Sequence, residues 1–216
     1  MRIPIHREGW PFIAIFATVN AALYFLSPWA ALVFAPVTIW CIAFFRDPER
    51  TPPPGDLKLV SPADGKLLPI IEAVPPEELG LGPTPRRRLS IFMDVFNVHV
   101  NRMPLAGTVE GLAYRPGKFF NASFDKASVH NERMSLRLRP KGSIVPDDDI
   151  VVVQIAGLVA RRIVCDVKQG DFVERGARYG MIRFGSRLDI YLPARAKILV
   201  KEGSMTVAGE TVLAEI

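Results

Sequence analysis

The stretch 180–193, GMIRFGSRLDIYLP, alternates apolar and polar side chains after its Gly-Ser pair. In a strand that begins at Ser186, successive side chains point to opposite faces. One face then carries Ser186, Leu188, Ile190 and Leu192, and the other carries Arg187, Asp189 and Tyr191. The serine faces the core side, where its hydroxyl needs a hydrogen-bond partner. A Gly-Ser pair alone is typical of a turn, so the pattern predicts a strand and leaves the role of the serine open.

Short apolar runs separated by turn signals continue through most of the chain. Nineteen prolines and sixteen glycines among 216 residues disfavour a protein built from long helices. Segment 75–88 lacks periodicity and is predicted to be a mobile loop that exposes Arg86, Arg87 and Arg88. The pattern predicts a β-rich α+β fold with a sandwich or barrel body. The expected strands are 57–60, 67–71, 89–100, 108–114, 134–138, 150–156, 161–167, 179–184, 188–192 and 197–200.

Two stretches near the C-terminus resemble each other. Residues 170–176 (GDFVERG) and 203–209 (GSMTVAG) each place glycines six positions apart around a strand-like centre. This arrangement is similar to the hammerhead sandwiches of biotinyl and lipoyl carriers. Those carriers present a modifiable lysine between apolar flanks, and this sequence has none in such a place. We therefore expect a hammerhead-like C-terminal part without the carrier function.

An uncharged segment occupies the N-terminal part of the chain, since residues 10–45 contain no Asp, Glu, Lys or Arg. As one helix these residues would extend about 54 Å, well beyond the roughly 30 Å of bilayer hydrocarbon. Ser27-Pro28 divides the segment near its middle and predicts a transmembrane helical hairpin. Trp10, Trp29 and Trp40 stand near the ends of the two halves, where indole favours the membrane interface. A shallow re-entrant loop remains an alternative.

Positive charges flank the apolar segment on both sides. Arg2 and Arg7 precede it, and Arg46 and Arg50 follow it, so both ends are predicted to be cytoplasmic. A cleaved signal peptide is disfavoured because the segment is too long and has a second apolar half. The expected organisation is a membrane anchor over 1–45, a proline-rich connector over 46–56 and a catalytic body over 57–216. The expected location is the cell membrane, with the body on the cytoplasmic side.

Charge and cysteine content exclude several classes of protein. A formal net charge of +5 gives no reason to expect a nucleic-acid partner. Cys41 lies in the apolar segment and Cys165 in an expected strand. Two cysteines so placed provide neither a disulfide framework nor a cysteine-based zinc site. No metal is predicted.

Several short motifs occur in order along the chain: 44–50 (FFRDPER), 61–65 (SPADG), 96–104 (FNVHVNRMP), 131–133 (NER) and 183–189 (RFGSRLD). Together they resemble the phosphatidylserine decarboxylase family, in particular its short prokaryotic type. The resemblance implies a proenzyme that cleaves itself between Gly185 and Ser186. The products would be a β chain, 1–185, and an α chain, 186–216. The first residue of the α chain, Ser186, would become a covalent pyruvoyl group, which serves as a pyruvate cofactor.

The resemblance also implies the chemistry. Ser186 would attack the carbonyl of Gly185, with His99 as the base and Asp64 orienting the imidazole in a triad-like arrangement. The pyruvoyl carbonyl would form a Schiff base with phosphatidylserine, and loss of carbon dioxide would give phosphatidylethanolamine. Long members of the family carry a second histidine where this chain has Arg102. The residue that protonates the carbanion is therefore open.

The expected partners are a phospholipid substrate, the membrane and the chain's own cleaved fragment in an α/β heterodimer, with higher oligomers left open. Two other functions compete with the decarboxylase hypothesis. One is a membrane-bound serine hydrolase that uses Ser186, His99 and Asp64 as a triad. The other is a non-catalytic lipid-binding module.

Overall fold

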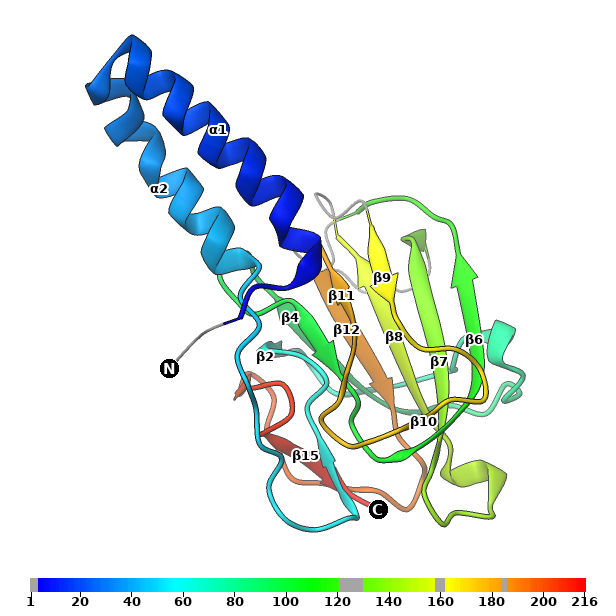
Figure 1. The fold of residues 1–216 in the computed structure, drawn as a ribbon. Helices are drawn as coiled ribbons and strands as arrows, with labels where there is room; N and C mark the ends of the chain where they lie inside the picture. The colour runs from blue at the N-terminus through cyan, green and yellow to red at the C-terminus, as the bar shows by residue number, and fades with distance from the viewer. Residues whose placement is uncertain (1–3, 121–129, 158–161, 184–185) are drawn as a thin grey trace.

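The computed structural model describes residues 4–120, 130–157, 162–183 and 186–216 of the chain, which form a β-rich body with two helices projecting from one side (Figure 1). The helices are α1 (Trp10–Leu26) and α2 (Pro28–Phe44), with short 3-10 turns η1 (Arg7–Gly9), η2 (Glu77–Leu79) and η3 (Pro146–Asp148). The strands are β1 (Lys58–Val60), β2 (Gly65–Leu67), β3 (Ile71–Ala73), β4 (Arg86–Met93), β5 (Val100–Arg102), β6 (Gly107–Arg115), β7 (Arg133–Pro140), β8 (Ile150–Ala156), β9 (Ile163–Cys165), β10 (Phe172–Val173), β11 (Arg178–Ile182), β12 (Ser186–Tyr191), β13 (Lys197–Ile198), β14 (Met205–Thr206) and β15 (Val212–Glu215).

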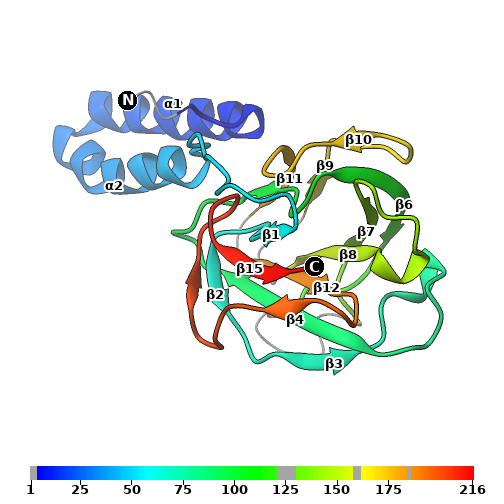
Figure 2. The same ribbon diagram turned by 90° about the horizontal axis from the view of Figure 1, so that it is seen from below.

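One large antiparallel sheet forms most of the body. Its strand order is β10-β6-β7-β8-β12-β4-β2-β14, and β3 adds to β4. Two small sheets, β1-β15-β13 and β5-β11-β9, pack with it. Figure 2 shows the large sheet curving around the core, with β1 and β15 lying across one end of the curve. The prediction of a β-rich body is confirmed.

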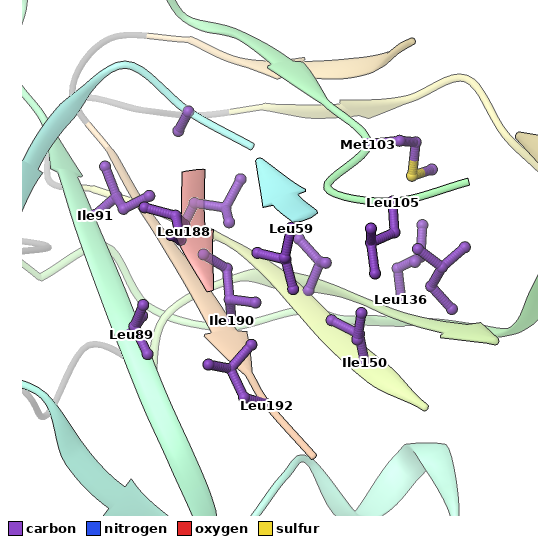
Figure 3. Close-up of a cluster of buried hydrophobic side chains, with 14 of the residues drawn as sticks. Leu59, Leu89, Ile91, Met103, Leu105, Leu136, Ile150, Leu188, Ile190 and Leu192 are labelled. Carbon is purple, nitrogen blue, oxygen red and sulfur yellow. The ribbon is translucent and has the colours of Figure 1, made fainter. Parts of the chain in front are cut away.

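Strand β12 lies in the middle of the large sheet, paired along its whole length with β4 on one side and β8 on the other. Leu188, Ile190 and Leu192 enter the main core (Figure 3). Tyr191 packs in a second, smaller cluster with residues such as Val151. The predicted two-faced alternation is confirmed.

The polar residues of the second face of β12 are also buried. Arg187 donates to Asp189 from Nε at 2.6 Å and from Nη2 at 2.8 Å. Both side chains are almost fully buried, at 1% and 0% exposure. Because each charge meets its opposite with good geometry, this strand can carry an ion pair inside the protein.

The predicted strand 89–100 is wrong in its extent. Strand β4 ends at Met93, and a turn at 94–97 leads to β5. Asp94 Oδ1 accepts the Phe96 N–H at 2.8 Å, and Asn97 Oδ1 accepts the Asp94 N–H at 2.9 Å. These side chains supply the backbone partners that a continued strand would have supplied, so the chain turns.

The expectation of an exposed loop through Arg86, Arg87 and Arg88 is also wrong. All three residues begin β4, and Arg88 is only 6% exposed. Arg86 donates to the Asp149 carbonyl at 2.6 Å, and Arg88 Nε lies 3.7 Å from Asp189. Partners that are distant in sequence therefore allow the arginines to occupy a strand.

The two similar C-terminal stretches each contain a short strand at the centre where the sequence suggested one. β10 lies between Gly170 and Gly176, whose φ angles are 93° and 78°, and β14 lies between Gly203 and Gly209, at 79° and 77°. Glycine adopts such positive φ angles without the steric cost that other residues meet. Each two-residue strand is thus bounded by two left-handed glycines.

Helices α1 and α2 meet at Ser27, as predicted. Ser27 is extended, with φ −163° and ψ 119°, as expected for a residue before proline. The helices lie side by side (Figure 1), and the rings of Phe16 and Phe34 stack at 6.0 Å. Large apolar side chains such as Phe25 (87%) and Trp29 (77%) are exposed. The segment Arg7–Leu26 is long and apolar enough to cross a membrane, whereas α2 is shorter, at 17 residues.

The helices are attached to the body through the residues that follow α2. Phe44 and Phe45 pack in a cluster with Met181 of β11. Arg178 donates to Asp47 at 2.8 Å, and Arg102 donates to the Pro48 carbonyl at 2.9 Å. The first part of the connector is therefore fixed to the body.

The core around β12 predicts a stability difference between two isoleucines. Ile190 is fully buried, and Ile144 is 94% exposed. Ile190→Ala should lower the free energy of unfolding by about 2–5 kcal/mol, because it removes buried methylenes and leaves a cavity. Ile144→Ala should change it by less than about 0.5 kcal/mol. Urea-dependent pulse proteolysis in detergent measures both, and equal effects would contradict the assigned core.

Candidate active site

Ser186 is the first residue of β12 and is fully buried. It lies opposite Met93 of β4 and Ala156 of β8. Its hydroxyl is 3.9 Å from the sulfur of Met93, which is a weak acceptor. The hydroxyl therefore lies buried at the end of three adjacent strands.

The other two Gly-Ser pairs of the chain differ from this one. Ser143 and Ser204 follow glycines with φ of 79° each, and both serines are only partly buried. The Ser143 N–H donates to the Pro140 carbonyl at 3.1 Å, and the Ser204 N–H donates to the Lys201 carbonyl at 3.2 Å. These two pairs are turns, whereas Ser186 begins a buried strand. Gly185, the other residue of the predicted cleavage site, lies outside the described residues.

His99 stands immediately before β5 and is fully buried. Its Nδ1 lies 3.0 Å from the Asn97 carbonyl oxygen. A carbonyl oxygen only accepts, so Nδ1 carries the proton and Nε2 is the acceptor atom of the ring. Phe44, the last residue of α2, covers the imidazole with ring centroids 4.2 Å apart.

Burial lowers the pKa of His99 from 6.5 to about 4, and the Asn97 carbonyl and the Asp94 charge oppose this shift only in part. The imidazole is therefore neutral at pH 7. A neutral imidazole with a fixed tautomer can accept a proton, as a general base must.

Asn101 and Gln154 add amides that sequence reasoning missed. Asn101 Nδ2 approaches the same Met93 sulfur, at 3.8 Å. Gln154 Nε2 donates to Asn101 Oδ1 at 2.8 Å and to the Val164 carbonyl at 3.3 Å. The Val164 carbonyl can only accept, so the amide nitrogen of Gln154 faces it. The same nitrogen then requires the oxygen of the Asn101 amide as its second acceptor. Asn101 is thereby held with its donor side toward the sulfur that Ser186 also contacts.

Two signals in the sequence could have identified these amides. Asn101 follows His99 by two positions, so in an extended segment both side chains share a face. Gln154 interrupts the apolar run IVVVQIA of β8. A polar residue inside a buried strand is more informative than the apolar residues around it.

Asp64 forms hydrogen bonds with residues other than His99. Its Oδ1 accepts the Ala208 N–H at 2.7 Å, and its Oδ2 accepts from Arg50 at 3.1 Å. Burial raises the pKa of Asp64, although the Ala208 hydrogen bond and the Arg50 charge oppose the shift. Asp64 precedes β2, which pairs with β4, so it lies near the Met93 end of the sheet. The orientation of His99 by Asp64 stays a prediction.

Asn131, from the motif 131–133, also lies at the end of the sheet that carries Ser186. Asn131 Nδ2 donates to the Ala156 carbonyl at 2.7 Å and to the Phe120 carbonyl at 2.8 Å. Since Ala156 lies opposite Ser186, Asn131 is linked through one backbone carbonyl to the strand position beside the serine. Within the described ranges, no three His, Cys, Asp or Glu side chains gather as a metal site requires.

A buried serine, a histidine held neutral by burial and residues of several sequence motifs thus lie on elements at one end of the large sheet. The phosphatidylserine decarboxylase family model matches residues 37–214, and the chain belongs to this family of carboxy-lyases. The chain is similar to the phosphatidylserine decarboxylase proenzyme of Cereibacter sphaeroides. The two are 54% identical over 213 residues, which cover 99% of this chain and 90% of that protein.

The lowered pKa of His99 predicts a pH dependence of stability. Between pH 6.5 and about 4, the unfolded chain binds a proton at this residue that the folded chain does not. Folding stability should therefore fall as pH falls, by about 2 kcal/mol between pH 7 and pH 5 from this group. The measurement is the free energy of unfolding against pH in a Ser186→Ala background, with and without His99→Gln.

The difference between the two slopes isolates His99 from other titrating groups, among them Asp64, whose raised pKa acts in the opposite direction. The slope should become shallower when His99 is replaced. Equal slopes over this range would show that the imidazole is not held neutral by burial.

Proposed function

We propose that this chain is a membrane-bound, pyruvoyl-dependent phosphatidylserine decarboxylase of the short type, made as a proenzyme that cleaves itself between Gly185 and Ser186. The observation that carries the proposal is the burial of the Ser186 hydroxyl at the head of the central strand, where the family's motifs converge. Family membership supports the same reaction.

Self-cleavage begins with a hydroxyl that is a weak nucleophile by itself. His99, which is neutral at pH 7 because burial lowers its pKa to about 4, accepts the proton of Ser186. The serine oxygen attacks the carbonyl carbon of Gly185, and the amine of residue 186 leaves with a proton returned by His99. A base removes the Cα proton of residue 186 as the carboxylate of residue 185 leaves, which gives dehydroalanine. Water then hydrolyses the dehydroalanine, which releases ammonia and gives the pyruvoyl group.

The residues around position 186 fit such a group. Met93 and Ala156, its neighbours across the sheet, are uncharged, and Ser186 itself is buried, so the group would lie in a largely apolar environment. When formed, the pyruvoyl group supplies an electron sink for the loss of carbon dioxide from the serine head group. His99 is the proposed proton donor to the product, and Asp64 remains a proposed supporting residue.

The two fragments would stay together after cleavage. In fragment 186–216, β12 pairs with β4 and β8, β14 pairs with β2, and β15 pairs with β1. All of these partner strands belong to fragment 1–185. We therefore propose an α/β heterodimer as the mature enzyme.

The proposed anchor is a transmembrane hairpin over 1–45, with the connector 46–56 and the body 57–216 on the cytoplasmic side of the cell membrane. Exposed apolar side chains on α1 and α2 support this arrangement. The contact of Phe44, the last residue of α2, with His99 supports a site at the base of this anchor. Phosphatidylserine could then present its head group without leaving the bilayer. Arg2 lies outside the described residues, so the charge argument on that side rests on the sequence.

We also propose that the C-terminal part is related to hammerhead sandwiches. The support is local: β10 and β14 are each bounded by two glycines with positive φ.

Two serine variants test self-cleavage. Wild-type protein should separate under denaturing conditions into fragments 1–185 and 186–216, the smaller one lacking a free amino terminus. Ser186→Ala should leave one intact chain and lower decarboxylation by at least about 10⁴-fold, because the nucleophile and the cofactor are both lost. Ser204→Ala, in a Gly-Ser turn, should process normally. Intact mass spectrometry and electrophoresis measure these outcomes, and cleavage of Ser186→Ala at this bond would refute the proposal.

A carbonyl reagent separates the decarboxylase from its alternatives. Borohydride added with phosphatidylserine should abolish carbon dioxide release and leave an adduct on fragment 186–216. A serine hydrolase would stay whole and would be insensitive to borohydride. A lipid-binding module would release no carbon dioxide at all. Release of ¹⁴C-labelled carbon dioxide and the fragment mass separate the decarboxylase from both alternatives.

A further inference from the structure

The turn 94–97 between β4 and β5 exposes two apolar residues immediately before the site. Val95 is 37% exposed and Phe96 is 70% exposed. The hydrogen bonds of Asp94 and Asn97 described above fix the backbone of this turn. The side chain of Phe96 is therefore presented to solvent by a built structure.

This turn is fastened to the end of helix α2. Trp40 Nε1 donates to the Val95 carbonyl at 3.2 Å, and Arg46 donates to the Phe96 carbonyl at 2.7 Å. Trp40 stands four residues before the end of α2 at Phe44, which is about 6 Å along the helix axis. In Figure 1 the chain between β4 and β5 passes beside this lower end of α2.

A bilayer that contains α2 must therefore have its surface near the turn. An indole favours the membrane interface, and a cation such as Arg46 is attracted to anionic lipid head groups. An exposed phenylalanine at the same level gains free energy when lipid covers it. Continuity with the apolar helices, and not exposure alone, identifies lipid as the partner.

We propose that the turn 94–97 is a lipid-binding element that inserts Val95 and Phe96 into the membrane surface beside α2. This inference rests on the proposed function, because it requires a membrane anchor and a lipid substrate. His99 follows Phe96 by three residues, so lipid contact by the turn sets the height of the imidazole relative to the serine head group. The turn thus acts on substrate access and not on the chemical step.

Phe96→Ser tests the lipid contact, with Phe172→Ser as its matched control. Phe172 is also exposed, at 52%, but lies on β10, away from the helices (Figure 1). Phe96→Ser should process normally. It should raise the KM for phosphatidylserine in phosphatidylglycerol-containing vesicles about tenfold. Its kcat/KM for a short-chain phosphatidylserine dissolved below its micelle concentration should stay unchanged, and Phe172→Ser should behave as wild type on both substrates.

An unchanged KM on vesicles, or an equal loss on both substrates, would overturn the lipid contact. A wild-type protein that neither cleaves itself nor decarboxylates either substrate would instead refute the proposed function. A second measurement does not depend on activity. A fluorophore on Val95→Cys, in a Cys41→Ala, Cys165→Ala background, should be quenched by nitroxide-labelled lipid head groups, whereas one on Phe172→Cys should not. Equal quenching of the fluorophore at positions 95 and 172 would also reject the proposal.

Discussion

The site depends on one constraint, the placement of the Ser186 hydroxyl at the start of a strand that is hydrogen-bonded on both sides. Strands β4 and β8 fix the backbone of β12 over its six residues, and the side chain has no exposure to water. A buried hydroxyl must find its partners within the protein. Among the residues that the structure describes, its acceptor is the Met93 thioether, which binds the hydroxyl weakly. The serine is therefore positioned by the sheet and only lightly restrained by its own hydrogen bond, which suits a group that has to react.

The same structure connects the apolar helices to the chemistry. Phe44 ends α2 and covers the His99 ring, and burial of that ring is the main reason for its lowered pKa. The Asn97 carbonyl meanwhile selects the tautomer. A base that is neutral and correctly protonated at pH 7 thus results from a helix end and a turn, without a carboxylate at Nδ1. The helices therefore contribute to the environment of the base as well as to the proposed attachment to lipid.

Local patterns predicted the parts of the structure that local chemistry determines. The alternation after Ser186 predicted β12 and its two faces, and Ser27-Pro28 predicted the division between the helices. The same reasoning failed for the arginines of β4, because Arg86 donates to the backbone carbonyl of Asp149 and Arg88 lies near the carboxylate of Asp189, and both partners are distant in sequence.

The site shows the same division between local and long-range information. Motif resemblance predicted Ser186 and His99 as site residues. The support from Asn101 and Gln154 depends on how β5 lies against the large sheet. Such a contact between two sheets leaves only faint marks in a single sequence, here a shared strand face and one polar residue in an apolar run.

The contacts of Arg102 exclude this residue as the base of the proposed reaction. Its guanidinium donates to the Gly176 carbonyl at 2.8 Å and to the Pro48 carbonyl at 2.9 Å, and it lies 3.6 Å from Asp47. Arginine stays protonated at neutral pH and cannot serve as a base. Arg102 instead fixes the connector to the body at the position where long family members have a second histidine. Arg102 therefore does not replace the second histidine as a proton carrier, and His99, held between Phe44 and the turn 94–97, is the histidine to which we assign the proposed proton transfers.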